Sequence, residues 1–534
     1  MYIGFNKKIS TFIGSDRLPI HNLNFRKMKD RKITSALISV YYKEGLDDIV
    51  LRLKELDVKI YSTGGTYDFI KKLGVEAESV ESLTTYPSIL GGRVKTLHPG
   101  VFGGILARRD SEEDREQLSR FKIPEIDLVV VDLYPFEETV SKTPEEEEII
   151  EKIDIGGISL IRAAAKNYGD VLVIPGREHY QRLLEILNAK GGITAIEERR
   201  YFAAEAFKTS SYYDTAIFNY FNRAEKIPAF RESIDTHYEL RYGENPHQKG
   251  IFFGDMAAIF DKLHGKEISF NNLLDVEAAI NLIDEFKEPA FAIIKHNNAC
   301  GIACRTSPAD AWKDALACDP VSAYGGIIIT NTGVDEITSR EIDKIFFEII
   351  IAPAYSKESL EVLQRKRNRI ILRRKGKTDS SFNYRSLLNG VLWQERDLST
   401  QTEADMKPVT ERVPGTGEFD DLVFANILVK HCKSNAIVIA KNKQLCASGI
   451  GQTSRVDALK QAIEKARSFG FDLTGSVLAS DAYFPFSDSV EIAHREGISA
   501  IVQPGGSVRD QDSIDYCNKN NLAMVFTGIR HFKH

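Results

Sequence analysis

Lys295 and His296 are neighbours in the segment IIKHNNACG, which begins with a short apolar run. Successive residues of a strand point to opposite faces, but at a junction between a strand and a loop both side chains can turn toward one cleft. A nearby lysine favours the neutral imidazole, which can accept a proton, and the ammonium can stabilise an oxyanion or donate a proton. The pair therefore indicates proton-transfer chemistry. An exposed pair without chemical importance is the alternative.

Further polar clusters adjoin apolar runs in the same part of the chain. They are RYGENPHQ with Arg241, DPVSAYGG with Gly325, KSNAIVIA with Asn435, and GQTSR with Arg455. The segment SDAYFPFSDSV sets Phe484 and Phe486 around a proline, which predicts either a platform for a flat heterocycle or a loop packed on the core. Arg530 lies in the C-terminal GIRHFKH, for which a frayed basic tail is the default expectation.

Two loops near the N-terminus have residues that suit an anion. STGGT places Thr63, Gly64 and Thr66 between a predicted strand and a predicted helix, where backbone amides can hold a phosphate. A tight turn with a threonine cap explains the same letters equally well. GGRVKTLHPG presents Arg93 and Lys95 in a loop bounded by glycine and proline. Loops with so many donors usually bind something, and cations predict an anionic small molecule.

The segment KIDIGGISLIRAAAKNYG predicts a helix that starts near Gly157 and carries Arg162 and Lys166 on one face. Its small and apolar neighbours indicate a mostly buried helix, so the two cations need a partner or a ligand. Asp154 could be a structural partner, or a catalytic carboxylate that faces Lys166. Tyr134 in DLYPF follows a buried strand, at the end where open α/β sheets bind ligands, although packing is the commoner role of an aromatic there.

Alternating strand and helix patterns must position these residues. Residues 33 to about 175 read as a parallel sheet with helices on both faces, and helical patterns continue to about residue 223. A boundary is expected near residues 225 to 238. The second part mixes strands (AFAIIK, GGIIIT, AIVIA, AIVQP) with helices (DVEAAINLIDEF, RVDALKQAIEKARSF). A polar, irregular stretch from about 375 to 420 divides it into two α/β lobes, without a strict sequence repeat to prove duplication.

Composition excludes several classes of protein. The chain has 534 residues, 43% hydrophobic residues and a net charge of -6, which fits a globular cytosolic enzyme without a basic field for nucleic acid. We expect no membrane span, no disulfide framework among the six cysteines and no zinc site. Residues 1–32 are basic and poor in acid. A disordered extension is expected there, with Met28 as the natural start, and a targeting segment or an anion-binding arm is the alternative.

Blocks from about Ile33 to His534 resemble, in order, those of the bifunctional family of AICAR formyltransferases and IMP cyclohydrolases. They are STGGT, GGRVKTLHPG, DLYPF, IDIGGISLIRAAAKN, RYGENPHQ, KHNNACG, DPVSAYGG, KSNAIVIA, GQTSR, SDAYFPFSDSV and GIRHFKH. The resemblance implies a methylglyoxal-synthase-like parallel-sheet domain at residues 33–228, which closes the ring. It also implies a formyltransferase domain at residues 229–534, built from two cytidine-deaminase-like α/β lobes (about 237–375 and 420–534) without zinc.

The resemblance also implies the chemistry. A formyl group would pass from the co-substrate 10-formyltetrahydrofolate to the 5-amino group of AICAR, and dehydrative ring closure would convert the product FAICAR to IMP. These are the last two steps of de novo purine synthesis. No metal is implied. The resemblance implies a homodimer with formyltransferase sites between its subunits, and the composition leads us to expect it in the cytoplasm.

Site residues follow from the same resemblance. His296 would take the proton of the amino group, and Lys295 would steady the oxyanion or protonate the departing N10. The implied ring-closing residues are Lys95, which would polarise the carbonyl, Tyr134, and the proton-managing Asp154 and Lys166. The implied substrate-binding residues are Ser39, Lys43, Thr63, Gly64, Thr66, Arg93, Thr96, Arg241, Tyr242, Asn272, Gly325, Asn435, Arg455, Phe484, Phe486 and Arg530. Among them, Arg241, Arg455 and Arg530 would hold the phosphate and the carboxamide, Asn435 and Phe486 would line the same cleft, and Phe484 would lie near the folate.

The chain departs from the family pattern at Asp132, Ala299 and Tyr324, where the family usually has asparagine, proline and phenylalanine. None of these changes removes a catalytic group. The rival functions are a nucleotide-sensing scaffold without catalysis and an enzyme with only one of the two activities.

Overall fold

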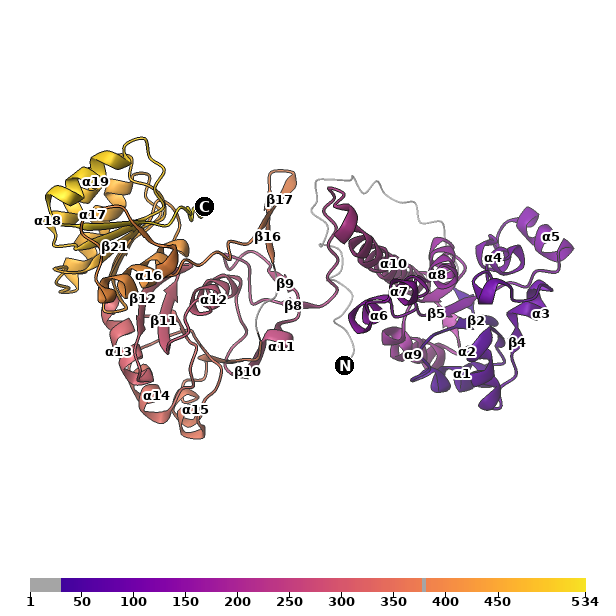
Figure 1. Cartoon of the computed structure of the whole chain (residues 1–534). Coiled ribbons are helices and arrows are strands. Elements are labelled where there is room, and N and C mark those ends of the chain that lie inside the picture. The colour runs from indigo at the N-terminus through magenta and orange to yellow at the C-terminus, as the bar shows by residue number, and fades with distance from the viewer. Residues whose placement is uncertain (1–29, 377–380) are drawn as a thin grey trace. The chain divides into compact units, whose positions relative to one another are not determined.

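The computed structural model describes residues 30–376 and 381–534 of the chain. The backbone divides into two units, Met1–Ser233 and Ile234–His534, each built from helices and strands (Figure 1). The division falls within residues 225–238, where the sequence lacks periodicity. Residues 1–29, most of the expected basic extension, lie outside the described part of the chain.

A five-stranded sheet forms the centre of the first unit, and all of its described pairings are parallel. In spatial order it contains β4 (Glu78–Ser79), β3 (Lys59–Ser62), β2 (Ser35–Ser39), β5 (Leu128–Val131) and β6 (Leu172–Ile174). Every residue of β5 is buried, as expected for a parallel strand that is covered on both faces. The parallel sheet predicted for this region is confirmed.

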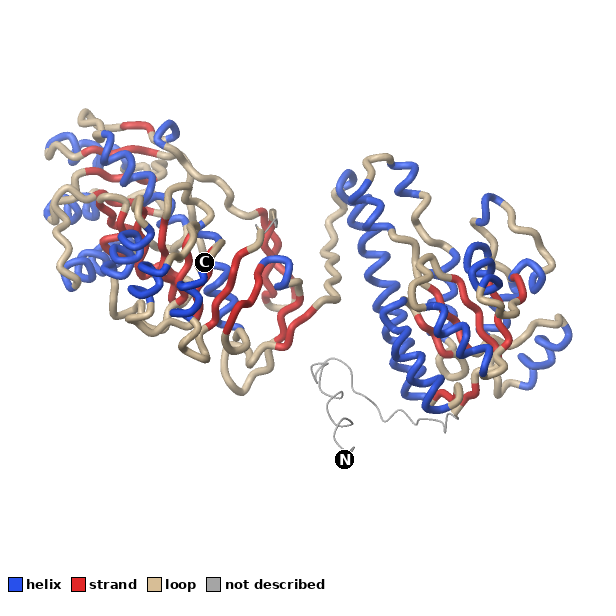
Figure 2. The backbone as a smooth tube through the Cα atoms, turned by 90° about the horizontal axis from the view of Figure 1, so that it is seen from below, coloured by secondary structure: helices blue, strands red, loops and turns tan. Residues whose placement is uncertain are grey.

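Helices cover both faces of this sheet (Figure 2). They are α1 (Leu46–Glu55), α2 (Gly64–Lys72), α3 (Val80–Thr84), α4 (Pro99–Leu106), α5 (Glu112–Arg120), α6 (Phe136–Lys142), α7 (Glu146–Ile150), α8 (Gly156–Lys166), α9 (Tyr180–Lys190) and α10 (Ile196–Glu225). Helix α1 packs on α9, and α8 packs on both α4 and α10. Helix α1 buries Leu46, Ile49, Val50 and Leu53 along one stripe, which explains its place against the core.

Two residues of the expected basic extension belong to the fold. Arg31–Lys32 form β1, which pairs antiparallel with β7 (Ile193–Thr194). The Arg31 guanidinium also lies 2.5 Å from the Asp170 carboxylate. The boundary that the sequence analysis set before Ile33 is therefore wrong for these residues, because a strand of two residues carries no periodic signal.

A twelve-stranded sheet runs through the second unit. In spatial order it contains β10 (Phe260–His264), β15 (Ile370–Arg374), β14 (Ile349–Ala352), β13 (Ile327–Thr330), β11 (Ala290–Lys295), β12 (Asn298–Cys304), β20 (Gln444–Gly449), β19 (Ile437–Lys441), β21 (Val477–Ser480), β22 (Ala500–Gln503), β23 (Ala523–Phe526) and β18 (Lys407–Pro408). The two halves of the sheet meet where β12 pairs with β20 at Ala303 and Gln444.

The two lobes share one topology. In each lobe an antiparallel hairpin is followed by a third strand, antiparallel to the first, and then by two parallel strands. The order β12-β11-β13-β14-β15 therefore matches β20-β19-β21-β22-β23. The repeat that the letters did not reveal is present in the fold.

Helices pack against this sheet, as they do in the first unit. The helices of one lobe are α12 (Phe270–Ile283), α13 (Pro308–Cys318), α14 (Glu336–Ile342) and α15 (Lys357–Leu363). Those of the other are α16 (Thr416–Lys430), α17 (Arg455–Ser468), α18 (Asp488–Arg495) and α19 (Asp510–Lys519). Two short elements, β8 (His237–Glu239) and β9 (Ile251–Phe253), pair before the first lobe, where α11 (Met256–Ile259) also lies.

The stretch expected to be irregular contains a hairpin. Strands β16 (Phe382–Leu387) and β17 (Gly390–Glu395) pair along their whole length, and their tip projects from the unit (Figure 1). Leu388 at the tip is 98% exposed, and Leu392 and Trp393 are also exposed. The sequence analysis did not predict this hairpin, because β16 alternates over only a few residues and β17 has the consecutive apolar residues Val391, Leu392 and Trp393.

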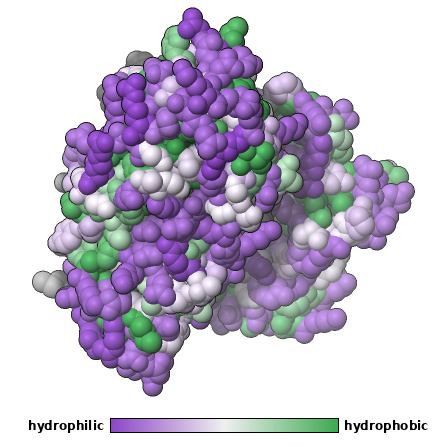
Figure 3. Space-filling view, turned by 60° about the vertical axis from the view of Figure 1, so that its left-hand side comes forward, coloured by the Kyte–Doolittle hydropathy of each residue, from purple (hydrophilic) through white to green (hydrophobic). Residues whose placement is uncertain are grey.

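The surface seen in Figure 3 is mostly hydrophilic, with hydrophobic residues in small patches between the polar ones. In the described ranges, no helix has the length and apolar character needed to cross a bilayer. All six cysteines are free thiols and lie buried. Burial raises the pKa of Cys432 and Cys517 to about 12, so these thiols stay protonated and unreactive.

Candidate active sites

The carboxyl edge of the first sheet gathers most of the residues predicted for one site. Ser39 ends β2, Thr63 precedes α2, Tyr134 follows β5, and Asp154 precedes α8. Parallel strands end at one edge, so these segments converge there, as predicted for an open α/β sheet. The loop with Lys95 lies against the same edge, because its ammonium approaches Gly64 at the start of α2.

The start of α2 is shaped for an anion. The Thr63 hydroxyl is buried and has no hydrogen-bond partner within the described structure. Gly64 has φ +51, and a Cβ there would lie 2.6 Å from the Lys95 Nζ, so the lysine approaches bare backbone. Thr66 instead bonds the backbone, since its hydroxyl donates to the Val40 carbonyl at 2.9 Å. A helix N-terminus, an unpartnered hydroxyl and an ammonium therefore lie close together, which suits an anion.

The remaining loop residues are held from neighbouring segments. Thr96 is buried, and its hydroxyl would be 2.9 Å from a Cβ at Gly156, which brings the loop against the start of α8. Arg93 is exposed and pairs with Glu151. The Lys43 ammonium donates to the backbone carbonyls of Val40 and Tyr41, and burial lowers its pKa.

Asp154 is the buried carboxylate of this edge. Its Oδ1 accepts the Gly157 amide at 2.6 Å, and burial raises its pKa against the stabilising effect of this amide and of the Tyr134 and Ile158 amides. Tyr134 is 44% exposed, and burial, followed by the charge of Asp154, raises the pKa of its phenol. A carboxylate with a raised pKa beside a phenol can exchange protons with a ligand.

Asp132 directly follows β5, and its carboxylate binds backbone amides. Its carboxylate accepts the backbone amides of Tyr41 and Tyr42, the latter at 3.0 Å, and burial raises its pKa. It therefore ties the loop after β2 to β5. The aspartate at this position, where the family usually has asparagine, provides carboxylate oxygens that accept both amides.

Lys152 is a residue of this edge that the sequence analysis missed. Its Nζ lies 5.5 Å from the ring centroid of Tyr41 and 5.7 Å from that of Tyr134. The two rings pack edge to face with centroids 5.6 Å apart. The sequence signal was its place two residues before Asp154, but only the fold shows the rings.

Lys166 does not reach this group in one chain. It ends α8, ten residues beyond Gly156, which is about 15 Å along the helix axis. Lys166 and Arg162 instead line a groove of about 700 Å³ between α4, α8 and α10. Arg162 donates to the Ser210 hydroxyl at 3.0 Å. The expectation that Asp154 partners these cations, or faces Lys166 catalytically, is wrong within one chain, because the helix separates them.

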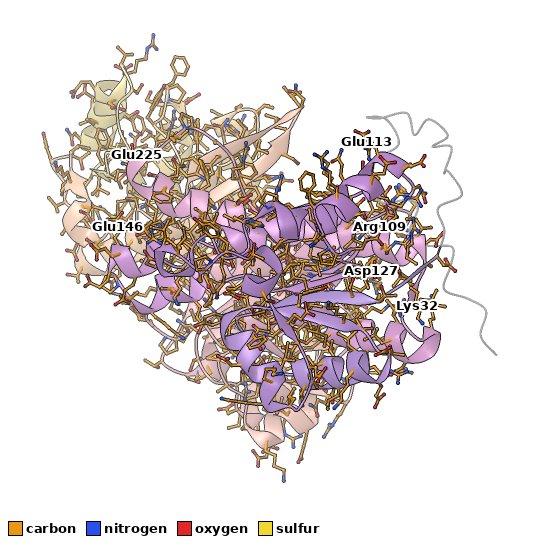
Figure 4. The ribbon with its side chains drawn as sticks, turned by 90° about the vertical axis from the view of Figure 1, so that its right-hand side faces the viewer. Lys32, Arg109, Glu113, Asp127, Glu146 and Glu225 are labelled. Carbon is orange, nitrogen blue, oxygen red and sulfur yellow. The ribbon has the colours of Figure 1, made fainter. Side chains whose placement is uncertain are left out.

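The opposite edge of the sheet is structural. The Arg109 guanidinium donates to the Gly104 and Ile126 carbonyls, each at 3.0 Å, and lies 4.0 Å from the Asp127 carboxylate. Asp127 in turn accepts the Thr34 amide at 2.9 Å. Figure 4 shows Arg109 and Asp127 close together on this side of the unit. Both side chains therefore form hydrogen bonds with the backbone around them, which is a structural role.

In the second unit, Lys295 and His296 sit at a tight turn between β11 and β12. His296 and Asn297 have φ of 53 and 65, and the Asp275 carboxylate of α12 accepts both amides, at 3.3 and 2.5 Å. Burial raises the pKa of Asp275. Asp275 of α12 therefore fixes the turn through its two backbone amides, and the His296 side chain is exposed. Sequence reasoning had no signal for the role of Asp275.

One cavity of about 320 Å³ brings the predicted pair together. Lys295 and His296 line it with Ala299, Ser322 and Lys465, among others. The Lys295 Nζ donates to the Tyr324 carbonyl at 2.5 Å, and a Cβ at Gly325 (φ 76) would be 3.9 Å from that nitrogen. Side chains from consecutive residues thus turn toward one cavity, as the sequence predicted.

Lys465 links this cavity to the other lobe. It comes from α17, and its Nζ lies 2.7 Å from the buried Asp319 carboxylate. Burial acts to raise the pKa of Asp319, but the hydrogen bonds of Lys465 and Ser322 outweigh it and lower the value. The sequence analysis identified the helix but not this residue, since nothing in the helix pattern shows which lobe it faces.

Asn435 and Arg455 form a second cluster at the end of β20. The Arg455 guanidinium is bound to Asp481 at 2.6 Å and to the Asn435 Oδ1 at 3.1 Å. Arg455 is 8% exposed. The Asn435 Nδ2 donates to the Gln452 carbonyl at 3.0 Å, close in sequence to Ile450 of the Lys295 cavity. The guanidinium is thus directed inward, which does not fit the predicted phosphate contact.

Several other predicted site residues have structural roles. Phe484 is 1% exposed and belongs to the core of its lobe, so the predicted folate contact is wrong for this ring, whereas Phe486 is 50% exposed and lies under Arg509. Asn272 completes the capping box of α12, since its Oδ1 accepts the amide and the hydroxyl of the N-cap residue Ser269, the latter at 2.9 Å. A ligand contact is not supported there.

The two exposed arginines stack on neighbouring rings. Arg241 lies 4.5 Å from the ring centroid of Tyr242 and donates to its hydroxyl at 2.5 Å. Arg530 lies 4.5 Å from that of Phe532. The C-terminal tail is not frayed, because the buried His531 bonds the Asp397 and Gln401 side chains. Neither arginine lines the cavity of Lys295 and His296 in the described chain.

Among the described residues, no group of three or more His, Cys, Asp or Glu is arranged to hold a metal ion.

Comparisons with known proteins cover nearly the whole chain. The model of the AICARFT/IMPCHase bienzyme family matches residues 164–465, and that of the MGS-like domain matches residues 45–159. The chain is 60% identical over 506 residues to the bifunctional purine biosynthesis protein PurH of Bacteroides thetaiotaomicron, over 95% of this chain and 100% of that protein. It is 46% identical over 509 residues to the protein of that name from Aquifex aeolicus, over 93% of this chain and 100% of that protein.

Proposed function

The chain belongs to the AICARFT/IMPCHase bienzyme family, and on that premise we propose how its residues divide two reactions between two sites. It catalyses the last two steps of purine biosynthesis, formyl transfer to AICAR and ring closure of FAICAR to IMP. Ring closure takes place in the first unit and formyl transfer in the second. The family implies a folate co-substrate, which is 10-formyltetrahydrofolate.

In formyl transfer, the amino nitrogen of AICAR attacks the formyl carbon while the bond from that carbon to N10 breaks. His296 accepts the proton that leaves the amino group, and N10 takes up a proton as tetrahydrofolate departs. Lys295 stabilises the oxyanion that forms on the formyl oxygen. The Tyr324 carbonyl orients the Lys295 ammonium by accepting a hydrogen bond from it. The shared cavity of Lys295 and His296 is the single observation that carries this proposal.

In ring closure, the carboxamide nitrogen attacks the formyl carbon of the same molecule and water is lost. Orientation dominates such a step, because both reacting groups belong to one substrate. The ribotide phosphate binds at the start of α2, with the unpartnered Thr63 hydroxyl and the Gly64 amide in support. Lys95 polarises the formyl carbonyl, and Asp154 and Tyr134 move the proton. Lys166 takes no part within one chain, because it lies at the end of α8 that is distant from Asp154.

The test is an assay of the purified full chain with AICAR and 10-formyltetrahydrofolate, in which tetrahydrofolate release is followed and the purine product is identified. IMP is the expected product. Accumulation of FAICAR would contradict the ring-closing site, and no turnover at all would favour a nucleotide sensor.

We further propose that the chain acts in the cytoplasm as a homodimer. The support is the exposed apolar hairpin β16–β17, since an isolated hairpin with exposed leucines gains stability from a covering partner. L392D should lower the dimer's sedimentation coefficient to that of the monomer, and S386D on the neighbouring strand should not. A dimer that L392D leaves intact would contradict the role of this hairpin.

A further inference from the structure

The edge of the first sheet that holds the proposed ring-closing residues also contains Lys152, which has no role in the reaction proposed above. Lys152 lies between α7 and α8, and its ammonium faces the rings of Tyr41 and Tyr134 at 5.5 and 5.7 Å. Both distances fall within the range of a cation–π interaction. Within the described residues, Lys152 has no carboxylate within ion-pair distance, although Glu151 and Asp154 are close in sequence.

The backbone around Lys152 is fixed. The Tyr213 hydroxyl donates to the Lys152 carbonyl at 2.7 Å and accepts the Asp154 amide at 2.9 Å. One phenol from α10 therefore sets the positions of both residues. The nearby acids are occupied, because Glu151 pairs with Arg93 and the Asp154 carboxylate accepts the Gly157 amide. The Lys152 ammonium therefore interacts with the rings of Tyr41 and Tyr134.

The rings themselves are partly open to solvent. Tyr134 is 44% exposed and Tyr41 is 42% exposed, and their edge-to-face contact is the only ring contact that the described structure gives Tyr134. A half-exposed phenol at the end of a strand would otherwise sample several rotamers. A cation that attracts the faces of both rings holds them in one arrangement.

We propose that Lys152 is a positioning residue for ring closure, which holds Tyr134 against Tyr41 through its ammonium and so fixes the phenol that serves the reaction. This inference rests on the proposed ring-closing role of Tyr134. It predicts that the charge and the reach of residue 152 matter, and that they matter through Tyr134. An arginine can supply both, since guanidinium groups stack well on aromatic faces.

The experiment supplies FAICAR directly to the full-length enzyme and measures kcat and KM of ring closure. K152M should lower kcat about tenfold and change KM less than about threefold. K152R should stay within about threefold of the native rate. Formyl transfer by the same preparations, in the other unit, checks that each variant is folded. K190M, at the end of α9 and paired with Glu198, is the control and should be neutral.

A double-mutant cycle with Y134F separates positioning from a structural effect. If Lys152 acts through Tyr134, K152M should slow the Y134F enzyme less than about twofold further. Full additivity would overturn the proposal, as would a rise in KM with kcat unchanged, which would mean direct substrate binding. K152R as slow as K152M would also overturn it. If Y134F itself leaves ring closure unchanged, the proposed role of Tyr134 fails, whereas slowing by Y134F but not by K152M defeats this inference alone.

Discussion

His296 owes its position to a turn that the chain builds twice. In the second lobe the turn between β19 and β20 also has two residues of positive φ, Asn442 and Lys443, and the Asp421 carboxylate accepts both amides. Asp275 and Asp421 are each the sixth residue of their helix, α12 and α16. The turn is thus a feature of the fold, and the imidazole is what the first lobe adds to it.

The repeat provides a matched control for the proposed general base. H296A should lower kcat of formyl transfer by about 10²–10⁴, the usual contribution of acid–base catalysis, and leave ring closure of supplied FAICAR unchanged. N442A removes a side chain from the same turn position in the other lobe and should leave both rates within about threefold. Equal loss from both variants would mean that the turn, and not the imidazole, is needed.

Residue types predicted the sites better than they predicted individual contacts. Lys295 with His296 and the STGGT loop each had a structural explanation as well, and it was the order of the motif blocks along the chain that indicated their place in the two sites. Arg455 and Phe484 were misjudged, because their burial depends on Asp481 and on a core assembled from distant segments. Lys152 was missed, since its two rings come from other loops.

At the scale of elements, the start of α2 depends on a close approach between backbone and lysine. G64A would place a Cβ 2.6 Å from the Lys95 Nζ at a φ of +51, so it should displace the ammonium and strain the turn. We expect ring closure to slow at least about tenfold. The adjacent G65A is the control, since nothing lies within 4 Å of its Cβ, and it should stay near the native rate. Equal rates for the two variants would show that the close approach is unimportant.

A buried cluster joins the end of α12 to the end of α16 and predicts the acid stability of the second unit. Burial acts to raise the pKa of Glu285, but hydrogen bonds from His431, Lys430 and Thr400 outweigh it and hold the value at about 2. Burial lowers the pKa of His431 despite the facing carboxylate, so Lys430, at 2.7 Å, supplies the balancing charge.

Because the pKa of Glu285 is lower in the folded state, the unfolded chain binds more protons in this range. The stability from Glu285 is therefore present above pH 4.5 and is lost as the pH falls toward 2, by about 3 kcal/mol. Denaturant unfolding of the full chain should show this loss in the native protein. E285Q should be less stable at pH 7 and have a shallower slope between pH 4.5 and 2. An unchanged slope would exclude Glu285 as its source.

The element order was largely predictable, because buried parallel strands and amphipathic helices have distinct periods. The strand order of the second unit was not. The match between β12-β11-β13-β14-β15 and β20-β19-β21-β22-β23 depends on pairings between distant segments, which leave no periodic trace in the letters. The hairpin β16–β17 was not predicted either, because its apolar residues are exposed and so give no pattern of one buried and one exposed face.

At the scale of the whole molecule, the chain divides after Ser233 into two units, and we propose one chemically independent site in each. If the sites are independent, FAICAR made in one unit is released and can be used by any competent ring-closing site. The units should therefore work when each is supplied by a different molecule of enzyme.

Mixing H296A with K95M tests this claim most directly. H296A should close the ring but transfer the formyl group about 10²–10⁴ times more slowly, and K95M should transfer the formyl group but accumulate FAICAR. Neither variant alone should make IMP from AICAR and 10-formyltetrahydrofolate at an appreciable rate. The equimolar mixture should produce IMP steadily after a lag in which FAICAR builds up. A mixture that yields no IMP, or a single variant that yields IMP at the native rate, would contradict the division of the two reactions between these sites.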